Sequence, residues 1–364
     1  MIIGVPKEVK EQESRVALLP SGAYQLVRKG HWVIVQRGAG SGAGYPDSEY
    51  ERVGAEMADE PAKVFGEADL IVKVKEPQAD EYEMLRPGQI LFTYLHLAAS
   101  RELTESLVDS GVTAVAYETI EVNRHLPLLE PMSEIAGRMS VLMGGYHLGK
   151  THGGSGVLLS GVPGVLPGRV LVLGGGTAGI NAARMATGLG ADVTILEVDL
   201  ERMHFLDISL HSAHTLYSNE EHLLDQLPQV DLLIGAVLVP GAKAPKLISR
   251  EMLSKMRPGS VFVDIAIDQS GCAETSRATT HHDPVFVEEG VNHYCVANMP
   301  AAYSRTATQA LANVTFKYVE TIANAGLVEA CVAHPELKGG INIRDKAVTC
   351  RAVAEAHGLE CSDL

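Results

Sequence analysis

The hydrophobic positions of this chain form short continuous runs, separated by longer stretches with helical spacing. In the first part of the chain the runs predict strands at residues 2–5, 32–35, 70–74, 90–95 and 112–117. Continuous runs are typical of strands that are covered on both faces. Helices are predicted between them at residues 20–29, 47–56 and 101–110. This alternation indicates an α/β domain with a parallel sheet.

A second block of the same kind begins near residue 170. Strands are predicted at residues 170–173, 193–196, 232–237, 261–265 and 293–297, and a helix at residues 178–189. Two βαβ halves in succession make a doubly wound sheet. The sequence therefore predicts two doubly wound domains with mostly parallel sheets.

Long helices are predicted to join the two blocks. Apolar residues have helical spacing in 133–151, where Ser133 is the predicted N-cap, and again in 306–325. The remaining tail, 326–364, has no sheet of its own. We therefore expect the chain to return to its first block, with the active site in a cleft between the domains. The predicted domains are a discontinuous substrate domain, 1–130 plus 303–364, and a Rossmann nucleotide-binding domain, 131–302.

Composition and charge exclude several classes of protein. The 364 residues include 30 Lys+Arg and 45 Asp+Glu, and the resulting net charge of −15 argues against a nucleic-acid-binding protein. No segment has the run of about 20 apolar residues that a membrane span needs, and the N-terminus lacks a signal-peptide pattern. The five cysteines form no CxxC motif. We expect no disulfide framework and no metal site, and free thiols fit a cytoplasmic protein.

The strongest motif is the segment 174–179, Gly-Gly-Gly-Thr-Ala-Gly, which follows a predicted strand and opens a predicted helix. Gly174 permits a tight turn, Gly176 allows the backbone to approach a pyrophosphate, and Gly179 allows close packing of helix and strand. The helix N-terminus, at Thr177 and Ala178, favours an anion. A glycine-rich turn without a ligand is the alternative interpretation.

An acidic residue at the end of the next predicted strand supports the nucleotide interpretation. Glu197 lies 23 residues after Gly174, where a carboxylate binds the adenosine ribose. The same carboxylate repels a 2′-phosphate, so the sequence favours NAD over NADP.

Polar side chains follow several of the predicted strands, where α/β sheets bind ligands. Arg15 and Lys75 are candidates to hold a carboxylate or a carbonyl oxygen, and His96 is a candidate acid/base. Asp268 follows a strand of the second block, and Glu118 either orients a neighbour or caps a strand. Taken singly, each also has a structural explanation, since solvated lysines and structural histidines are common at such positions.

Several further motifs are similar to those of the alanine dehydrogenases. They cover essentially the whole chain and are more specific than the glycine motif. They are Gly-Val-Pro-Lys-Glu at 4–8, Glu-Ser-Arg-Val-Ala at 13–17, Val-Lys-Val-Lys-Glu-Pro at 72–77, Thr-Tyr-Leu-His at 93–96, Pro-Met-Ser-Glu-Ile-Ala-Gly-Arg at 131–138, the run 234–245, Asp-Ile-Ala-Ile-Asp-Gln at 264–269 and Val-Ala-Asn-Met-Pro at 296–300.

The resemblance implies reversible oxidative deamination of L-alanine to pyruvate and ammonium with NAD, in a homohexamer. It places the carboxylate-binding arginine at Arg15, the substrate lysine at Lys75, the acid/base at His96 and the catalytic aspartate at Asp268. The cofactor contacts that it implies, with the glycine motif, are Ser133, Thr177, Glu197, Arg202, Ser218, Val237, Leu238, Ile265, Ala266, Ile267, Asp268, Arg277, Val296, Ala297, Asn298 and Met299.

The sequence departs from the family pattern at a few positions. Segment 301–304, Ala-Ala-Tyr-Ser, replaces the usual Gly-Ala-Val-Pro, Ser270-Gly271 replaces Gly-Gly, and Glu197 replaces an aspartate. The alternatives are the nucleotide-binding part of a transhydrogenase, a saccharopine dehydrogenase relative, and a non-catalytic NAD-binding protein. The set of Arg15, Lys75, His96 and Asp268 favours amino-acid chemistry over the transhydrogenase and the non-catalytic protein.

Overall fold

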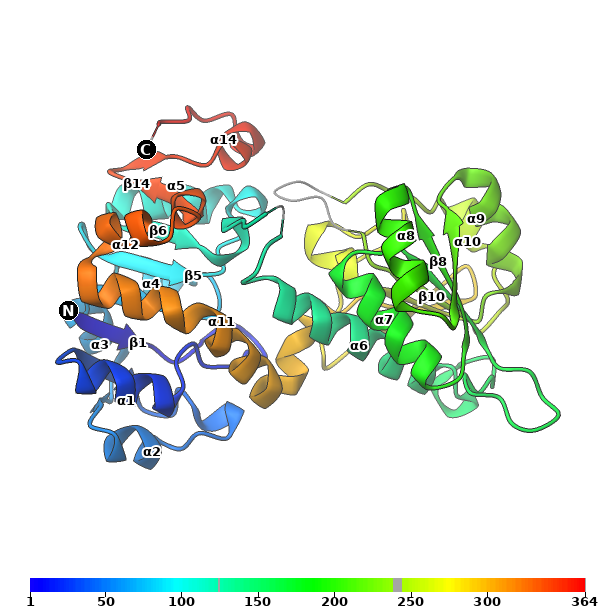
Figure 1. Cartoon of the computed structure of the whole chain (residues 1–364), viewed down its shortest axis with the longest axis horizontal. Coiled ribbons are helices and arrows are strands. Elements are labelled where there is room, and N and C mark those ends of the chain that lie inside the picture. The colour runs from blue at the N-terminus through cyan, green and yellow to red at the C-terminus, as the bar shows by residue number, and fades with distance from the viewer. Residues whose placement is uncertain (124, 238–243, 364) are drawn as a thin grey trace. The chain divides into compact units, whose positions relative to one another are not determined.

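The structure, a computed structural model, describes residues 1–123, 125–237 and 244–363. The chain forms two compact units, each organised around a mostly parallel sheet (Figure 1). Unit 1 comprises Met1–Met132 and Ala301–Leu364, and unit 2 comprises Ser133–Pro300. The predicted α/β class with two doubly wound sheets is confirmed.

The sheet of unit 1 has the strand order β15-β14-β6-β5-β4-β1-β2-β3. Strands β1 to β6 are parallel, and the C-terminal tail adds β14 and β15 in antiparallel orientation. The strands are β1 (Ile2–Val5), β2 (Trp32–Gln36), β3 (Glu56–Ala58), β4 (Leu70–Val72), β5 (Ile90–Thr93), β6 (Thr113–Ala116), β14 (Ile341–Arg344) and β15 (Ala347–Val348).

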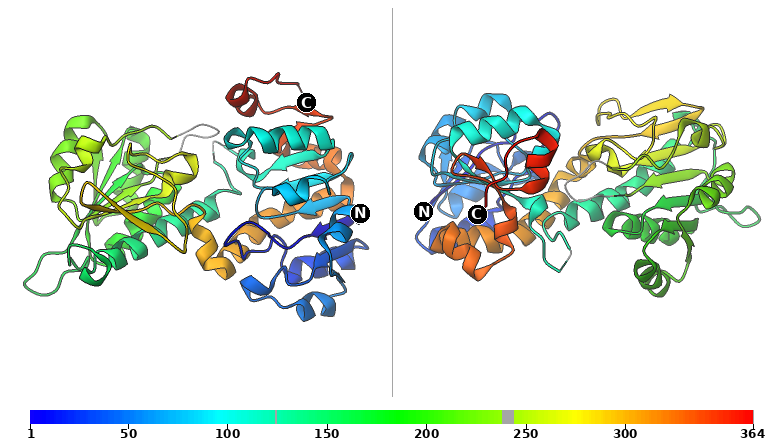
Figure 2. Two further views of the ribbon diagram at one scale, coloured as in Figure 1. Left: turned by 180° about the vertical axis from the view of Figure 1, so that it is seen from behind. Right: turned by 90° about the horizontal axis from the view of Figure 1, so that it is seen from above.

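Helices cover both faces of this sheet (Figure 2). Alternate strand residues, Ile34, Ile71 and Leu91, pack with α3 and α5, while their neighbours are buried on the opposite face. The helices of unit 1 are α1 (Pro20–Arg28), α2 (Asp47–Arg52), α3 (Pro61–Glu67), α4 (Ala79–Tyr82), α5 (Arg101–Ser110), α11 (Ser304–Ala325), α12 (Leu327–Ala333), α13 (Leu337–Gly340) and α14 (Arg351–His357).

Two features of unit 1 differ from the sequence predictions. The helix predicted to reach residue 56 ends at Arg52, because Gly54 adopts a φ of 90°, and Glu56 starts the unpredicted strand β3. The tail supplies two strands that its hydrophobic pattern did not indicate.

The sheet of unit 2 has the order β12-β13-β11-β10-β7-β8-β9, in which β12 is antiparallel and the remaining pairs are parallel. Its strands are β7 (Arg169–Leu173), β8 (Asp192–Glu197), β9 (Ala213–Tyr217), β10 (Leu232–Gly235), β11 (Val261–Asp264), β12 (Val285–Glu288) and β13 (Val291–Tyr294). Strand order reverses between β7 and β10, as in the classic dinucleotide-binding fold. The pattern predicted neither β9 nor β12.

Two hydrophobic layers hold the helices of unit 2 to its sheet. Val172, Ile195 and Ile234 pack with α6 and α7, whereas the alternate residues Leu173 and Leu233 pack with α9 and α10. The helices are α6 (Glu130–His147), α7 (Thr177–Gly188), α8 (Leu200–Ser209), α9 (Glu220–Gln226) and α10 (Arg250–Leu253).

The long helix α6 starts earlier than predicted. It begins at Glu130, so Ser133 lies inside the first turn and the prediction of Ser133 as the N-cap is wrong. In the described part of the chain, no helix has both the length and the hydropathy needed to cross a membrane.

Close packing of α6 on α7 yields a stability prediction. A Cβ atom on Gly137 would lie 2.1 Å from the carbonyl oxygen of Ala178, whereas a Cβ on Gly188 of α7 would meet nothing within 4 Å. We expect Gly137→Ala to destabilise the protein by about 3 kcal/mol through overpacking. Gly188→Ala should be neutral or stabilise it by about 0.5–1 kcal/mol. Calorimetry of both variants beside the wild type checks this, and equal melting temperatures for the two variants would contradict it.

Candidate active site

Unit 1 brings its candidate residues to one edge of its sheet. Strand β1 lies between β2 and β4, so the strand order reverses at β1 and β4. Parallel strands end at the same edge, and ligands bind at such a switch point. Arg15 follows β1, Lys75 follows β4, His96 follows β5 and Glu118 follows β6.

Arg15 is a buried cation held by a neighbouring carboxylate. Its side chain is 1% exposed, and its Nε and Nη2 donate to the two oxygens of Glu13 at 2.7 and 2.5 Å. Its Nη1 lies 3.0 Å from the sulfur of Met132, a weak acceptor. Burial disfavours the charged form, but Glu13 outweighs this effect and raises the pKa of Arg15. The guanidinium is therefore fixed and remains charged.

Lys75 is also buried, and its ammonium makes no hydrogen bond to the described residues. Its backbone carbonyl accepts a hydrogen bond from Thr93 Oγ1 at 3.0 Å, which ties the segment after β4 to β5. Burial raises the pKa of the adjacent Glu76, but Lys75 and Lys10 lower it by more, so the net shift is downward. Lys75 therefore presents a donor for which an oxygen of a bound anion is a suitable partner.

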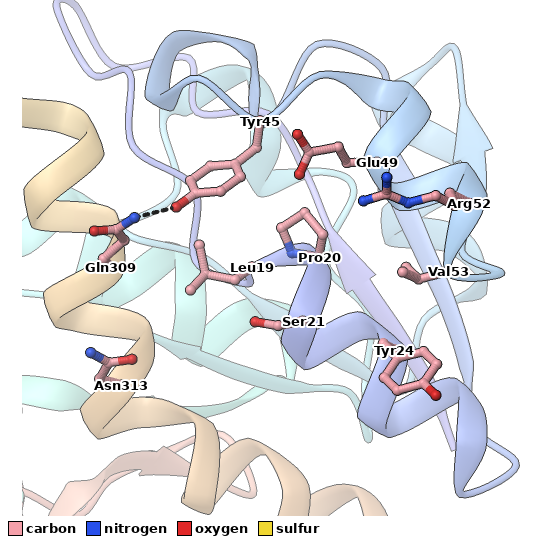
Figure 3. A pocket seen from close by; sticks show the side chains of 10 residues that line it. All are labelled: Leu19, Pro20, Ser21, Tyr24, Tyr45, Glu49, Arg52, Val53, Gln309 and Asn313. Atoms are coloured by element: carbon pink, nitrogen blue, oxygen red, sulfur yellow. Dashed lines mark hydrogen bonds between the residues drawn. The ribbon is translucent and has the colours of Figure 1, made fainter.

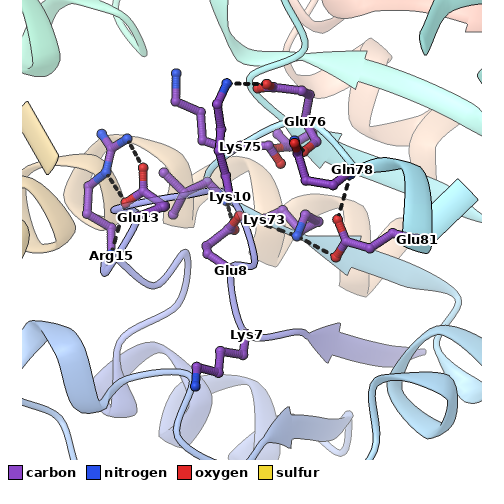
Figure 4. Close-up of polar contacts among 12 residues, drawn as sticks. Lys7, Glu8, Lys10, Glu13, Arg15, Lys73, Lys75, Glu76, Gln78 and Glu81 are labelled. Carbon is purple, nitrogen blue, oxygen red and sulfur yellow. Dashed lines mark hydrogen bonds and ion pairs between the residues drawn. The ribbon is translucent and has the colours of Figure 1, made fainter. Parts of the chain in front are cut away.

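A buried ion network lies beneath these two cations (Figure 4). Lys73 Nζ is 2.8 Å from Glu81 and 3.3 Å from Glu8, and all three side chains are buried. Glu8 also accepts the backbone N–H of Val74 at 2.7 Å. Burial raises the pKa of Glu8, while Lys73 opposes that shift. Because Glu8 follows β1 and Val74 follows β4, this network joins the two strands at the switch point.

His96 has an unusual backbone conformation at the end of β5. Its φ of 49° and ψ of 41° lie in the left-handed region, and its side chain is 40% exposed. The ring stacks on Tyr94 with a centroid distance of 6.0 Å and an interplanar angle of 8°. Tyr94 is anchored because its hydroxyl donates to the carbonyl of Leu128 at 2.5 Å. An exposed imidazole at this edge is suitably placed for proton transfer.

Unit 2 contains the glycine turn at the end of β7. Gly174 has a φ of 92°, and a Cβ on Gly179 would lie 1.9 Å from the Gly174 carbonyl oxygen. A Cβ on Gly176, the residue before α7, would meet nothing within 4 Å, so the backbone there is open. Close packing at Gly179 and open backbone at Gly176 fit a dinucleotide pyrophosphate at the N-terminus of α7.

Glu197 closes the same turn from the end of β8. Its Oε2 accepts the N–H of Gly175 at 2.7 Å, and its Oε1 accepts the N–H groups of Val198 and Asp199 at 2.7 and 3.1 Å. Arg202 Nε donates to the Gly175 carbonyl at 2.6 Å, and burial lowers the pKa of this arginine. Oε2, which accepts one N–H group, has further acceptor capacity, which suits a hydroxyl of a ribose.

Asp268 lies in a short 3₁₀ helix, Ile265–Gln269, which follows β11. It is exposed, and its Oδ1 accepts the N–H of Asn298 at 3.3 Å. This contact brings together two of the predicted stretches, 265–268 and 296–299.

Asp264 was missed by the sequence analysis. It is fully buried and accepts from Ala266 N, Cys272 N and Ser276 Oγ at 3.0, 2.9 and 2.6 Å. Burial raises its pKa. It therefore fixes the segment that carries Asp268.

The remaining predicted cofactor residues of unit 2 are distributed over α6 and the strand ends. Ser133 is in α6, and Ser218 follows β9, where its N–H donates to the Glu197 carbonyl at 2.8 Å. Val237 follows β10, and Arg277 lies over the ring of Phe286 at 3.9 Å. Leu238 lies outside the described residues. The roles of all these residues stay predictions.

The carboxylates around the cations were also not predicted, namely Glu8, Glu13 and Glu81. One signal could have indicated them, because Lys73 interrupts the apolar run 70–74 and a buried lysine requires an acidic partner. His281 precedes β12, with its Nε2 3.2 Å from the Asn298 carbonyl oxygen. Among the described residues, no three His, Cys, Asp or Glu side chains gather as a metal would require.

An open cavity of about 680 Å³ lies elsewhere on unit 1 (Figure 3). Residues of α1, α2 and α11 line it, and Gln309 donates to the Tyr45 hydroxyl at 2.7 Å at its rim. None of the predicted site residues is among the residues that line it. The cavity is therefore distinct from the cation-bearing edge of the sheet.

Comparison with known proteins gives two family-model matches. The model "Alanine dehydrogenase/PNT, N-terminal domain" matches residues 4–136, and "Alanine dehydrogenase/PNT, C-terminal domain" matches residues 140–351. Curated relatives include an alanine dehydrogenase of Halomonas elongata, 55% identical over 99% of this chain and 98% of the relative. The alanine dehydrogenase of Bacillus subtilis is 52% identical over 99% of this chain and 96% of the relative.

Two solved structures are also similar over nearly the whole chain. An L-alanine dehydrogenase structure has a TM-score of 0.93 and 48% identity, covering 98% of this chain and 99% of that chain. A transhydrogenase structure from Sinorhizobium meliloti has a TM-score of 0.82 and 26% identity, covering 96% of this chain and 100% of that chain.

The ion network predicts a pH-dependent loss of stability. Lys73→Met leaves Glu8 and Glu81 buried without their cation, at a cost of about 3–5 kcal/mol. Removing the lysine raises the folded-state pKa of Glu8 further above its unfolded value. When the pKa of a carboxyl group is higher in the folded state than in the unfolded state, stability is lost as the pH rises from the unfolded-state pKa through the folded-state pKa. The deficit of Lys73→Met relative to wild type should therefore be smaller at pH 5 than at pH 8 in urea unfolding.

Lys63→Met is the matched control, because Lys63 also pairs with a glutamate, Glu56, but at an exposed site. It should change the unfolding midpoint little at either pH. A deficit for Lys73→Met that is equal at both pH values would contradict the assignment.

Proposed function

The chain belongs to the alanine dehydrogenase/PNT family, and we propose that it catalyses the reversible, NAD-dependent oxidative deamination of L-alanine to pyruvate and ammonium. The observation that carries this proposal is the pair of buried cations Arg15 and Lys75 at the switch point of unit 1, with His96 at the same sheet edge. A small 2-oxo acid offers a carboxylate and a carbonyl oxygen to such a pair.

Arg15 and Lys75 bind and polarise the substrate. In the amination direction, Arg15 holds the carboxylate of pyruvate, and its pairing with Glu13 limits the entropy lost on binding. Lys75 donates a hydrogen bond to the keto oxygen and draws electrons from the carbonyl carbon, where ammonia adds.

His96 then transfers protons. It protonates the oxygen as the carbon–nitrogen bond forms, takes a proton back from the added nitrogen, and then gives that proton to the hydroxyl, which departs as water and leaves the protonated imine. Asp268 orients ammonia and balances the positive charge of the imine. A bound nicotinamide dinucleotide supplies the hydride in this direction and accepts it in the reverse direction.

Unit 2 holds the dinucleotide in this proposal. Gly174, Gly176 and Gly179 shape the pyrophosphate turn, and Glu197 accepts the ribose hydroxyls. The Glu197 carboxylate would repel the 2′-phosphate that NADP carries on this ribose, which supports NAD rather than NADP.

An activity test with two histidine variants checks this function. The wild type should reduce NAD with L-alanine and show much weaker activity with NADP. His96→Ala should lower kcat by about 10²–10⁴-fold, the usual contribution of a general acid/base, and leave the Kd for NAD unchanged. His31→Ala, at an exposed site paired with Asn324, is the control and should retain full activity. Tight NAD binding without L-alanine-dependent reduction would reject the proposal, and full activity of His96→Ala would reject the role of His96.

We also propose that the enzyme is a homo-oligomer of the cytoplasm, a hexamer as the resemblance implies. The segment 157–168 has no charged residue in a chain of net charge −15, and like-charged copies associate best through neutral surfaces. Four of its side chains, Leu158, Val162, Val165 and Leu166, are 54–84% exposed. An exposed apolar patch of this kind marks an interaction site.

A charged side chain in the segment 157–168 should dissociate the oligomer into smaller species. Leu166→Glu places a buried charge in the proposed contact, so light scattering after size exclusion should show a lower molar mass than for wild type. Leu247→Glu, at another exposed leucine, is the control and should keep the wild-type mass. A monomeric wild type, or an unchanged mass for Leu166→Glu, would contradict the proposal.

A further inference from the structure

His96 is held by a carboxylate from the next strand. The backbone N–H of His96 donates to Glu118 Oε1 at 2.6 Å, and the N–H of Leu95 donates to both oxygens at 3.1 and 3.2 Å. Glu118 lies in the short 3₁₀ helix Tyr117–Thr119 that follows β6. Two successive amide groups thus converge on one anion, an arrangement that backbone in the left-handed region favours.

The conformation of His96 requires such a support. A residue other than glycine is strained at a φ of 49°, and strain of this kind persists only where the surrounding structure holds the residue in place. Charge-assisted hydrogen bonds are stronger than neutral ones, and Glu118 supplies them from a side chain that is only 12% exposed. Without these bonds the residue is free to relax to an ordinary extended or helical conformation, which moves its imidazole.

Glu118 also faces the imidazole itself. Its Oε1 is 4.0 Å from Nδ1 of His96, so this edge of the ring faces the carboxylate. With Nδ1 facing Glu118, the opposite nitrogen, Nε2, is the one available to a reactant. Tyr94 bounds the flat face of the ring by stacking on it.

We propose that Glu118 is the positioning residue of His96: its carboxylate fixes the left-handed backbone at His96 and the orientation of the imidazole. This role rests on the proposed function of His96 as the acid/base. In this role Glu118 acts through His96 and not on the substrate directly. Its sequence position, directly after β6, matches that of His96 after the neighbouring β5.

A double-mutant cycle tests whether Glu118 acts through His96. Glu118→Ala should lower kcat about 10²-fold, within the contribution of the acid/base itself. The KM for pyruvate should stay within about twofold, because Glu118 contacts neither Arg15 nor Lys75, the residues proposed to bind the substrate. In a His96→Ala background the Glu118→Ala change should lower kcat less than about threefold, because the effects of two residues that act as one unit are not additive. An equal loss in both backgrounds would overturn the proposal.

Conservative and control variants complete the series. Glu118→Gln retains one oxygen that accepts from the His96 N–H, so it should have an intermediate kcat. Its neutral side chain keeps the shape of the buried site, so it remains informative if Glu118→Ala folds poorly. Glu121→Ala removes an exposed carboxylate three residues away and should retain wild-type kcat. A loss in Glu121→Ala equal to that in Glu118→Ala would contradict a specific role.

A structural readout separates this inference from the proposed function. In a crystal structure of Glu118→Ala, or of Glu118→Gln if the first variant folds poorly, His96 should leave the left-handed region and its ring should move from Tyr94. If His96 keeps its φ and ring position there, the positioning role is wrong. A wild type without L-alanine-dependent reduction of NAD would reject the proposed function, while the crystal structure would still decide whether Glu118 positions His96.

Discussion

Three cations, Arg15, Lys73 and Lys75, are buried at one edge of the first sheet, and the candidate active site depends on how their charge is neutralised. Unpaired charges in such surroundings are costly. Glu13 takes two donors of Arg15, and Glu8 and Glu81 flank Lys73. Two lysines that are two positions apart therefore differ, since Lys73 is paired with two carboxylates and the Lys75 ammonium makes no hydrogen bond to the described residues.

The same network also fixes geometry. Glu8 binds both Lys73 and the backbone of Val74, so the segment that carries Lys75 is tied to the segment after β1. Glu118 ties the ends of β5 and β6 in a comparable way. In both cases a carboxylate from one strand end accepts a backbone N–H of a neighbouring strand end. The positions of the polar groups therefore depend on contacts across the sheet edge more than on the strands alone.

These contacts explain what the sequence could and could not reveal. Long apolar runs such as 170–173 and 2–5 predicted strands within about one residue, because burial on both faces leaves a clear pattern. Strand β9 has partly exposed residues, and β3 is short, so neither has that pattern. The candidate site residues could be predicted because ligands bind at the carboxyl ends of parallel strands, and each candidate follows such a strand. The position of Glu8 beside Lys73 could not be predicted, because Glu8 and Val74, whose N–H it accepts, are 66 positions apart in the sequence.

The two sheets show how one topology supports two kinds of chemistry. Each sheet contains six parallel strands, which are β1 to β6 in unit 1 and β7 to β11 with β13 in unit 2. The strand order reverses beside β1 in unit 1 and beside β7 in unit 2. In unit 2 the helix α7 begins at Thr177, four residues after β7, so open backbone and a helix N-terminus meet at the switch point. In unit 1 the helix α1 begins only at Pro20, and the intervening segment supplies Glu8, Glu13 and Arg15 instead. The length of that one connection decides whether backbone amides or charged side chains occupy the switch point, and therefore whether it suits a pyrophosphate or a small carboxylate.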